Sequence, residues 1–435
     1  MTDTTHSLST KTTYHILALL LVGSFILRVA FSIASDPAEI LDSGGDDPFY
    51  FQVGQYLVTG YDYSEIVIPV PPLYLLVTGT PQLFLPAHTA VFAIQVFQAL
   101  ALTMACYFVF GIALCIAQDR RVALLAAGTM ATSLAFITES TSLQTEPLYI
   151  ALVLGGMWLY ITGFLVTENS TSRRWLSLVL AGVLLGLGTL TRPVLLLFPV
   201  GLAIHLAMLR EWKAIPTLLL AYALMTLTWT AYTSLYYEWT VIGSNQFIPA
   251  VWRGAVETDI NPFLSDQALG DETYSEQASR VIQADLTGYL SLRIRETAGA
   301  ILQPHGTLVW GDETSIRTLL VTWFNDGFSL EATQTLLTAN GFVPKLLIYI
   351  WHYVGLLGGI VGMWLTRDKW RFTLPLMGYI AYTVLLHFVS LFEPRYFFPT
   401  MPFFWVFTAV TIVTMWDALM RTKNGNNKVA PVQDS

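Results

Sequence analysis

The chain has 435 residues, of which 54% are hydrophobic and 12% are charged, and its formal net charge is −8 at pH 7. The charged share is about half that of an average soluble domain, so a water-exposed surface cannot cover the whole chain. This composition excludes an ordinary soluble protein and predicts an all-α integral membrane protein. Cys106 and Cys115 lie in one apolar segment, which argues against a disulfide framework and against a thiolate metal site.

Ten apolar segments predict membrane-spanning helices, which need about 20 mostly apolar residues each. The apolar stretch 69–87 is short and bounded by prolines, so we expect it to lie as a helix at the membrane interface instead of crossing. The ten predicted spans are 14–34, 90–117, 122–138, 147–166, 175–190, 194–209, 214–236, 343–366, 372–392 and 396–417.

The basic residues predict which loops face the cytoplasm, because inner loops collect Lys and Arg. The loop after the first span contains acidic residues but no Lys or Arg, so it is expected on the outer face. Both termini are then cytoplasmic, in a multi-pass protein of the plasma (inner) membrane. The inner segments hold Lys11, Arg120, Arg121, Arg173, Arg174, Arg210, Lys213, Arg367, Lys369, Arg371, Arg421, Lys423 and Lys428.

Four regions follow from this topology. The extracytoplasmic domain, the second of them, is expected to be a small cap of amphipathic helices. Its apolar residues recur at helical spacing on one stripe, at Val281, Leu286, Leu290 and Ile294. The regions are an N-terminal transmembrane module at 1–236 with its first outer loop at 35–88, an extracytoplasmic domain at 237–342, C-terminal transmembrane helices at 343–421, and a flexible cytoplasmic tail at 422–435.

An acidic pair stands out in the first outer loop, in "GGDDPFYFQVGQYLVTG" at 44–60. Pro48 suits the first turn of an interfacial helix, so Asp46 or Asp47 could serve as its N-cap beside a solvated charge. Alternatively, one aspartate is a general base at the membrane interface, where aromatic neighbours and a second carboxylate tune its pKa. Both interpretations are open on these residues alone.

Further ionisable residues are predicted on the same outer face. Each arginine alone could simply extend to the interface, but charges at the hydrocarbon edge are costly unless they serve a pathway or a site. Their common side therefore indicates one shared site. These residues are Arg28 in the first span, Glu139 and Glu146 in "TESTSLQTEPLYI", Arg192 in "TLTRPVLLLFP", His387, and Glu393, Arg395 and Tyr396 in "LFEPRYFFPTMP".

The order of these features resembles that of the GT-C glycosyltransferases, membrane enzymes that take a sugar from a polyprenyl-phosphate carrier. Protein O-mannosyltransferases and lipid A aminoarabinose transferases are examples. The resemblance rests on "GGDDPFYFQVGQYLVTG", "PPLYLLV", "TEPLYIALVLGGMWLY", "LGTLTRPVLLLFP" and "EPRYFFPTMPFFWV", and it fades in the extracytoplasmic domain.

The resemblance implies an inverting transferase of hexosyl or pentosyl groups, with its active site on the extracytoplasmic face. Asp46 matches the catalytic aspartate, which takes a proton from the acceptor hydroxyl, and Asp47 matches a second acid that orients the acceptor or binds a metal. Val70 departs from the family pattern, where a polar or basic residue often precedes the "PPL". The residues expected to bind substrate are Arg395 first, for the carrier phosphate, then Arg192 and Arg28, with Glu146, Tyr50 and Tyr396.

The expected partners are a polyprenyl-phosphate-linked sugar donor, a lipid, glycan or protein acceptor, and the bilayer, with no nucleic acid. No cofactor is certain, and use of a divalent metal stays open, with Asp47, Glu146 and His305 as candidate ligands. No spacing such as HxxxH supports a metal site.

The competing interpretation is a polytopic transporter or flippase, or a ligase of lipid-linked glycans. Transporters usually place ionisable residues near the membrane midplane, on broken helices in two corresponding halves. Here the charges gather on one face and no half repeat is evident. A third interpretation, a non-catalytic assembly subunit, predicts that loss of Asp46 is harmless.

Overall fold

The computed structural model describes residues 9–43, 45–60, 70–166, 171–236, 241, 247–256, 273–311, 316–339 and 341–426. Every regular element within these ranges is helical, which confirms the predicted all-α class.

Each of the ten predicted spans contains helix. Six helical segments among the described residues are long and apolar enough to cross a membrane, so the count of ten crossings stays a prediction. The helices are α1 (Thr10–Ala34), α5 (Ala87–Ala117), α6 (Arg120–Thr132) with α7 (Leu134–Thr138), α8 (Glu146–Trp158) with η3 (Leu159–Leu165), α9 (Thr171–Thr189), η4 (Pro193–Leu195) with α10 (Phe198–Met208), α11 (Ala214–Tyr236), α17 (Phe342–Leu365), α18 (Trp370–Phe388), and α19 (Pro394–Phe397), η8 (Phe398–Thr400) and α20 (Met401–Asn426).

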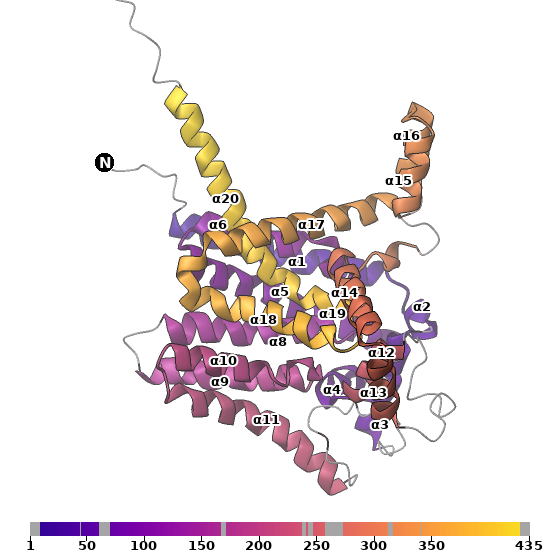
Figure 1. Cartoon of the computed structure of the whole chain (residues 1–435), viewed down its shortest axis with the longest axis vertical. Coiled ribbons are helices and arrows are strands. Elements are labelled where there is room, and N and C mark those ends of the chain that lie inside the picture. Colours follow the sequence, from indigo (N-terminus) through magenta and orange to yellow (C-terminus); the bar gives the residue numbers. More distant parts are fainter. Residues whose placement is uncertain are drawn as a thin grey trace, which may run out of the picture.

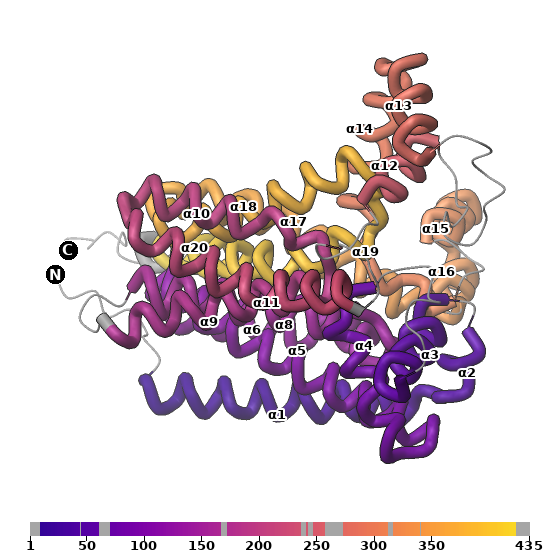
Figure 2. The backbone as a smooth tube through the Cα atoms, turned by 90° about the horizontal axis from the view of Figure 1, so that it is seen from below, coloured from indigo at the N-terminus to yellow at the C-terminus, as the bar shows by residue number. Residues whose placement is uncertain are grey.

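The long helices lie side by side as a bundle, and shorter helices gather at one of its ends (Figures 1 and 2). We call this the site end. The opposite end, where α1 begins and α20 ends, we call the basic end. The helices at the site end are α2 (Pro37–Asp42), α3 (Asp46–Thr59), α4 (Pro72–Gly79), α12 (Phe247–Val256), α13 (Tyr274–Ala284), α14 (Leu286–Leu302), α15 (Ile316–Asn325) and α16 (Leu330–Thr338).

The turn between α5 and α6 shows how the chain reverses at the basic end. Gln118 takes a left-handed conformation with φ of 58°, and its N–H bonds the Leu114 carbonyl. Asp119 then caps α6 by accepting from the Arg121 N–H at 2.8 Å. The Arg121 guanidinium donates two bonds of 2.8 Å to Asp417 of α20. These contacts join the middle of the chain to its last helix at this end.

The apolar stretch that was expected not to cross is indeed short. It forms α4 and the 3₁₀ turn η2 (Thr80–Leu83), which pack against α3. The two helices touch through glycines, because a Cβ on Gly79 would overlap the carbonyl of Gly54. In addition, the Thr78 hydroxyl donates to the Tyr50 carbonyl at 2.9 Å. Close backbone contact therefore fixes the direction of α3, which carries the acidic pair.

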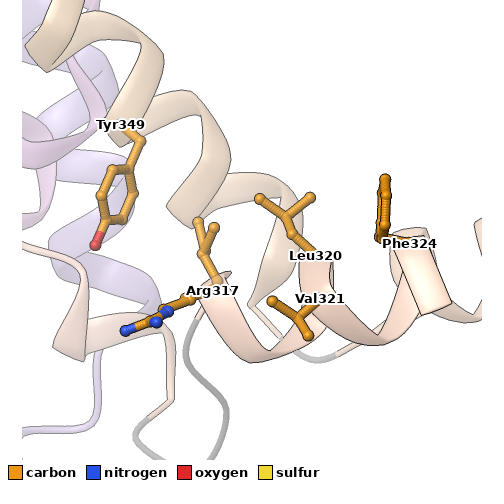
Figure 3. A pocket seen from close by; sticks show the side chains of 6 residues that line it. Arg317, Leu320, Val321, Phe324 and Tyr349 are labelled. Carbon is orange, nitrogen blue, oxygen red and sulfur yellow. The ribbon is translucent and has the colours of Figure 1, made fainter.

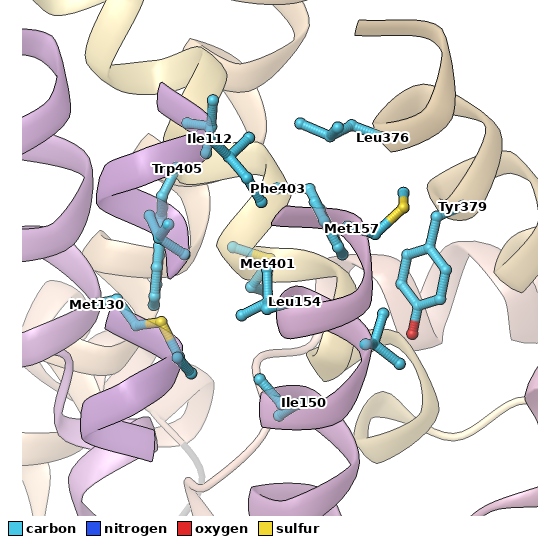
Figure 4. Packing of buried hydrophobic residues seen from close by; sticks show 14 of the residues in the cluster. Ile112, Met130, Ile150, Leu154, Met157, Leu376, Tyr379, Met401, Phe403 and Trp405 are labelled. Atoms are coloured by element: carbon cyan, nitrogen blue, oxygen red, sulfur yellow. The ribbon is translucent and has the colours of Figure 1, made fainter. Parts of the chain in front are cut away.

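The core of the bundle joins helices from both halves of the chain (Figure 4). Leu154 and Met157 of α8 pack beside Tyr379 of α18 and Phe403 of α20, and all four side chains are buried. The Tyr379 hydroxyl also donates to the Tyr149 hydroxyl at 3.0 Å. Burial of this kind contributes about 1.5–3 kcal/mol for each large apolar side chain, so the helix ends at the site rest on a rigid support.

The described part of the region 237–342 is helical, as predicted, but the predicted apolar stripe is wrong. Asp285 ends α13 and caps α14 by accepting from the Gly288 N–H at 2.8 Å, so the chain bends there. Val281 packs near Trp252, whereas the three later stripe residues, Leu286, Leu290 and Ile294, are exposed. Because the chain bends between α13 and α14, the buried face of α13 is not continued along α14.

Candidate active site

The acidic pair occupies the first turn of α3. Its N-cap is Gly45, and neither Asp46 nor Asp47 caps the helix, so the capping interpretation is wrong. The two carboxylates instead reach across to other elements. Asp46 Oδ2 accepts from Arg395 Nη1 at 2.5 Å, while Asp47 Oδ1 accepts from the Leu143 N–H at 2.9 Å and from Gln144 Nε2 at 2.7 Å. The adjacent aspartates therefore have separate partners.

The environment of Asp47 alters its acidity. Burial raises the pKa of Asp47 to about 6, although the hydrogen bonds from Gln144 and Leu143 lower it, and the nearby Glu139 and Asp46 carboxylates raise it further. Loss of hydration disfavours the charged carboxylate, and the two donors compensate only in part. Asp47 is thus a group that changes charge near pH 6.

Arg395, at the start of the last helical pass, is the centre of a cluster of polar contacts. Its guanidinium pairs with Asp46, and its Nε lies 2.9 Å from Glu393 Oε2. Nη2 donates to the Tyr396 hydroxyl at 3.3 Å. The side chains of Arg395 and Asp46 are 32% and 45% exposed, so a ligand can reach both groups.

Behind this open pair lies a buried one. Glu146, the first residue of α8, forms an ion pair with Arg192, and their side chains are only 3% and 11% exposed. The Arg192 guanidinium also lies 5.4 Å from the centre of the Tyr396 ring, a cation–π distance. Burial alone would lower the pKa of Arg192, but the Glu146 carboxylate outweighs it and the pKa is raised. Both groups therefore stay charged inside the protein.

A third pair joins the region 237–342 to the bundle. His305 Nε2 lies 2.7 Å from Glu139 Oε2, and the His305 ring is tilted against the Phe398 ring, with 4.7 Å between their centres. Burial lowers the pKa of His305, but the Glu139 carboxylate overcomes this and the net pKa is raised. This pairing is not evident from the sequence, because the two residues are 166 positions apart.

Most of the predicted site residues come together. Tyr50 contacts Tyr74 edge to face at 5.3 Å, and burial raises its pKa, as do the Asp46 and Glu146 carboxylates. Tyr396 lies between the two arginines described above and stacks on His387 at 4.7 Å. The roles expected for these residues stay predictions.

Arg28 lies apart from the others. Its guanidinium is buried and donates to the carbonyls of Met130 and Ala131, at 3.3 and 3.4 Å, near the end of α6. It also bonds Ser24, one turn earlier in α1. These contacts provide hydrogen-bond acceptors for the buried charged guanidinium. The expected role of Arg28 in substrate binding stays a prediction.

The candidate metal ligands do not converge. Asp47 is held by Leu143 and Gln144, Glu146 pairs with Arg192, and His305 pairs with Glu139. Within the ranges that the structure covers, no three His, Cys, Asp or Glu side chains form a group able to hold a metal ion. These three residues therefore do not fit a shared divalent ion, and no step of the chemistry below depends on one.

Two glutamines that sequence reasoning missed hold the loop between α7 and α8. Gln98 Nε2 donates to the Ser142 carbonyl at 2.5 Å, and its Oε1 accepts from the Tyr74 hydroxyl at 2.6 Å. Gln95 Nε2 donates to the Thr141 carbonyl at 2.6 Å. A signal existed in the sequence, since two amides three residues apart in an apolar helix need buried partners.

Part of the chain matches a known protein family. Residues 61–252 match the model of the dolichyl-phosphate-mannose-protein mannosyltransferase family. The matched segment contains Glu139, Glu146 and Arg192, but it begins after Asp46 and Asp47 and ends before Arg395. No curated protein sequence matches the chain significantly.

The fold is similar to that of known membrane glycosyltransferases. The oligosaccharyltransferase of Archaeoglobus fulgidus in its apo form aligns with a TM-score of 0.52 at 15% identity, covering 98% of this chain and 53% of that one. The archaeal oligosaccharyltransferase AglB from the same organism, in complex with an inhibitory peptide and a dolichol-phosphate, gives 0.53 at 14%, covering 97% and 52%. ArnT from Cupriavidus metallidurans, bound to undecaprenyl phosphate, gives 0.41 at 15%, covering 93% and 78%.

The chain spans about half the length of the two oligosaccharyltransferases. The expected resemblance to GT-C glycosyltransferases is confirmed at the level of fold, because nearly the whole chain aligns with these structures.

Proposed function

We propose that this chain, a multi-pass membrane protein with the GT-C fold, is an inverting glycosyltransferase that moves a sugar from a polyprenyl-phosphate donor to an acceptor hydroxyl. The observation that carries the proposal is the ion pair of Asp46 with Arg395. It places a carboxylate beside a guanidinium where ligands can reach both. A base for the hydroxyl and a cation for the phosphate are the two groups that this transfer needs.

Asp46 is the general base in this proposal. Its carboxylate accepts the proton of the acceptor hydroxyl while the hydroxyl oxygen bonds the anomeric carbon. The bond from that carbon to the phosphate oxygen breaks, and the polyprenyl phosphate leaves with the electron pair. Because attack comes from the side opposite the phosphate, the anomeric configuration inverts. Asp46 lies in the first turn of α3, where the N–H groups of the helix end are directed toward incoming negative charge.

Arg395 binds the donor phosphate in this proposal. A planar guanidinium can form two parallel hydrogen bonds to a phosphate, which stabilises the charge that develops on the leaving group. The same guanidinium contacts Asp46 and Glu393, so an arriving phosphate competes with Asp46 for it. Donor binding would then release the Asp46 carboxylate, and capture of the phosphate would activate the base.

The neighbouring residues position these two groups. Asp47 is proposed to orient the acceptor, since it lies beside Asp46 and is itself fixed by Gln144. The buried pair of Glu146 and Arg192 supports Tyr396, and Tyr396 in turn contacts the guanidinium of Arg395. We propose that Tyr50 and Tyr396 contact the sugar or the carrier.

The site end is proposed to face the extracytoplasmic side, and the basic end the cytoplasm. Arg121, Arg174 and Arg371 contact other residues at the basic end, through Asp417, Glu211 and the Leu165 carbonyl respectively. Basic residues favour the cytoplasmic side. Both termini are then cytoplasmic, and the donor is a lipid of the membrane in which the chain lies.

The alternative of a transporter or flippase is not favoured. A transporter would place its ionisable groups near the middle of the bundle on broken helices. The pairs of Asp46, Glu139 and Glu146 instead lie at the ends of helices, beside the extracytoplasmic domain.

The test is sugar transfer by the purified protein from a panel of radiolabelled polyprenyl-phosphate sugars, with a native membrane extract as acceptor. The wild type should transfer at least one sugar with inversion, and Asp46→Asn should not. If the folded wild type consumes no donor, or if Asp46→Asn transfers normally, the proposed function is wrong. Product configuration, read by nuclear magnetic resonance, separates inversion from retention.

A further inference from the structure

A groove on the site end lies apart from the acidic pair. It has a volume of about 410 Å³ and lies between α15 and α17. In Figure 3 the Tyr349 hydroxyl and the Arg317 guanidinium lie toward one end of the groove, and the side chains of Leu320, Val321 and Phe324 continue away from them. One end of the groove is therefore polar and the remainder is apolar. Its lining residues are Ile316, Arg317, Leu320, Val321, Phe324 and Tyr349.

The apolar wall of this groove is left open by the residues that the structure describes. No residue of α15 is buried, and Phe324 and Val321 are 65% and 51% exposed. Large exposed apolar surfaces in a folded chain mark a site for a partner or for a membrane. Some apolar molecule is therefore needed to cover this wall.

The other wall of the groove belongs to a membrane-spanning helix. α17 is a candidate span, and its exposed apolar side chains include Leu347, Ile350 and Val354. Tyr349 lies about two turns into α17, and its ring is near that of Tyr353 at 6.1 Å. Tyr and Trp collect where a span enters the lipid headgroups. The groove is thus continuous with the apolar surface that this candidate span would present to lipid.

The polar end of the groove carries a positive charge. Arg317 is exposed, and none of the ion pairs found among the described residues involves it. A guanidinium at the headgroup level attracts a lipid phosphate by charge-assisted hydrogen bonds. An amphiphile with a phosphate head and apolar chains therefore matches both ends of the groove.

The groove is separate from the proposed site of transfer. Figure 1 shows α15 and α16 well away from α3, and Arg395 lies with α3 through its pair with Asp46. The phosphate of a sugar donor has its own partner there. A lipid in the groove is accordingly a different molecule, supplied by the surrounding leaflet.

We propose that the groove between α15 and α17 binds one anionic glycerophospholipid, with its phosphate on Arg317 and an acyl chain along Leu320, Val321 and Phe324. The lipid attaches the α15–α16 pair to the membrane surface. This proposal does not depend on glycosyl transfer, and it can hold if the proposed function fails.

The first experiment is native mass spectrometry of the full chain released from detergent, with phosphatidylglycerol, phosphatidylcholine, a polyprenyl phosphate or inorganic phosphate added in turn. We expect one retained phosphatidylglycerol per chain, at least fivefold above phosphatidylcholine. Arg317→Gln should reduce this adduct at least fivefold. The matched control is Arg295→Gln, which removes an exposed arginine of α14 and should leave the adduct unchanged.

The second experiment locates the lipid. A phosphatidylglycerol with a diazirine in its acyl chain should label peptides containing Val321 or Tyr349, and Val321→Asp should abolish that labelling while the elution profile stays that of the wild type. The proposal is overturned if Arg317→Gln retains the lipid, if polyprenyl phosphate displaces phosphatidylglycerol, or if inorganic phosphate does so. Label spread evenly along α17 would equally overturn it.

Discussion

Arg395 Nη1 and Asp46 Oδ2 lie 2.5 Å apart, although 349 positions separate the two residues in the sequence. This ion pair joins α3 at the site end to the last helical pass of the chain. Because both side chains are partly exposed, the pair adds little to stability, about 0–1 kcal/mol for pairs of this kind. We infer that its value lies in function, since it holds a proposed base and a proposed phosphate ligand within one contact.

Changes at Arg395 should affect the donor more than the acceptor. In Arg395→Ala we expect kcat/KM for the donor to fall about 100-fold, which corresponds to about 2.7 kcal/mol of lost phosphate stabilisation. Arg395→Lys should recover part of the rate, because it keeps the charge but loses the planar fork. Steady-state kinetics with donor and acceptor varied separately give the answer. A donor KM that stays at the wild-type value would contradict a phosphate ligand.

Removal of the base should lower kcat strongly. In Asp46→Asn we expect a loss of about 10²–10⁴-fold, the usual contribution of general base catalysis. Combined with Arg395→Ala, the losses should not add, because the two side chains act through one contact. Asp42→Asn, an exposed aspartate at the end of α2, is the control and should behave as the wild type. Fully additive losses would show that the two residues act independently.

The buried pair should matter chiefly for stability. In Glu146→Gln the Arg192 guanidinium loses its counter-charge while it stays buried, so we expect the free energy of unfolding to fall by about 3–5 kcal/mol. The double variant Glu146→Gln/Arg192→Met should be more stable than Glu146→Gln alone. Thermal unfolding in detergent measures both. A double variant less stable than either single variant would show that the charges do not compensate each other.

Asp47 should give the enzyme an acid limb near pH 6. Its pKa is about 6, so its carboxylate becomes protonated as the pH falls through that value. If the carboxylate orients the acceptor, kcat/KM for the acceptor should fall below about pH 6. Asp47→Asn should be slow at every pH and should lack this limb. A limb that persists in Asp47→Asn would assign it to another group.

The same shift has a defined sign for stability. The folded pKa of about 6 lies above the ordinary value of 3.8, so the folded state binds this proton more tightly than the unfolded state. The contribution of Asp47 to stability is therefore fully present below about pH 4 and is lost as the pH rises through 6. The difference in thermal unfolding temperature between the wild type and Asp47→Asn, measured from about pH 4 to above pH 6, tests this prediction.

Sequence reasoning predicted that the charged residues lie together, but not how they pair. The acidic pair, Glu146, Arg192 and Arg395 could be assigned to one face, because basic loops predict which end of each span points outward. Which carboxylate meets which arginine could not be predicted, since this depends on the rotation of each helix about its axis. Arg28 illustrates the limit, because it was grouped with the other charged residues but its guanidinium contacts the carbonyls at the end of α6.

The capping alternative for the acidic pair fails for a related reason. Pro48 correctly indicated a helix, but the helix begins at Asp46, one residue too early for Asp46 to cap it and two residues too early for Asp47. Gln144 was missed because a polar residue in an outer loop looks solvated in sequence. Its role appears only when α3 and the loop before α8 meet.

The close glycine contact between α3 and α4 makes the position of Asp46 sensitive to the angle between these two short helices. The helices touch at Gly54, and Asp46 lies eight residues from it, which is about 12 Å along α3 at about 1.5 Å per residue. A tilt of α3 by about 5° about this contact then displaces the Asp46 carboxylate by about 1 Å, a misplacement large enough to cost about 100-fold in rate. A methyl group added at Gly79, an uncharged residue outside the proposed substrate contacts, would thus displace the Asp46 carboxylate and lower the rate of transfer.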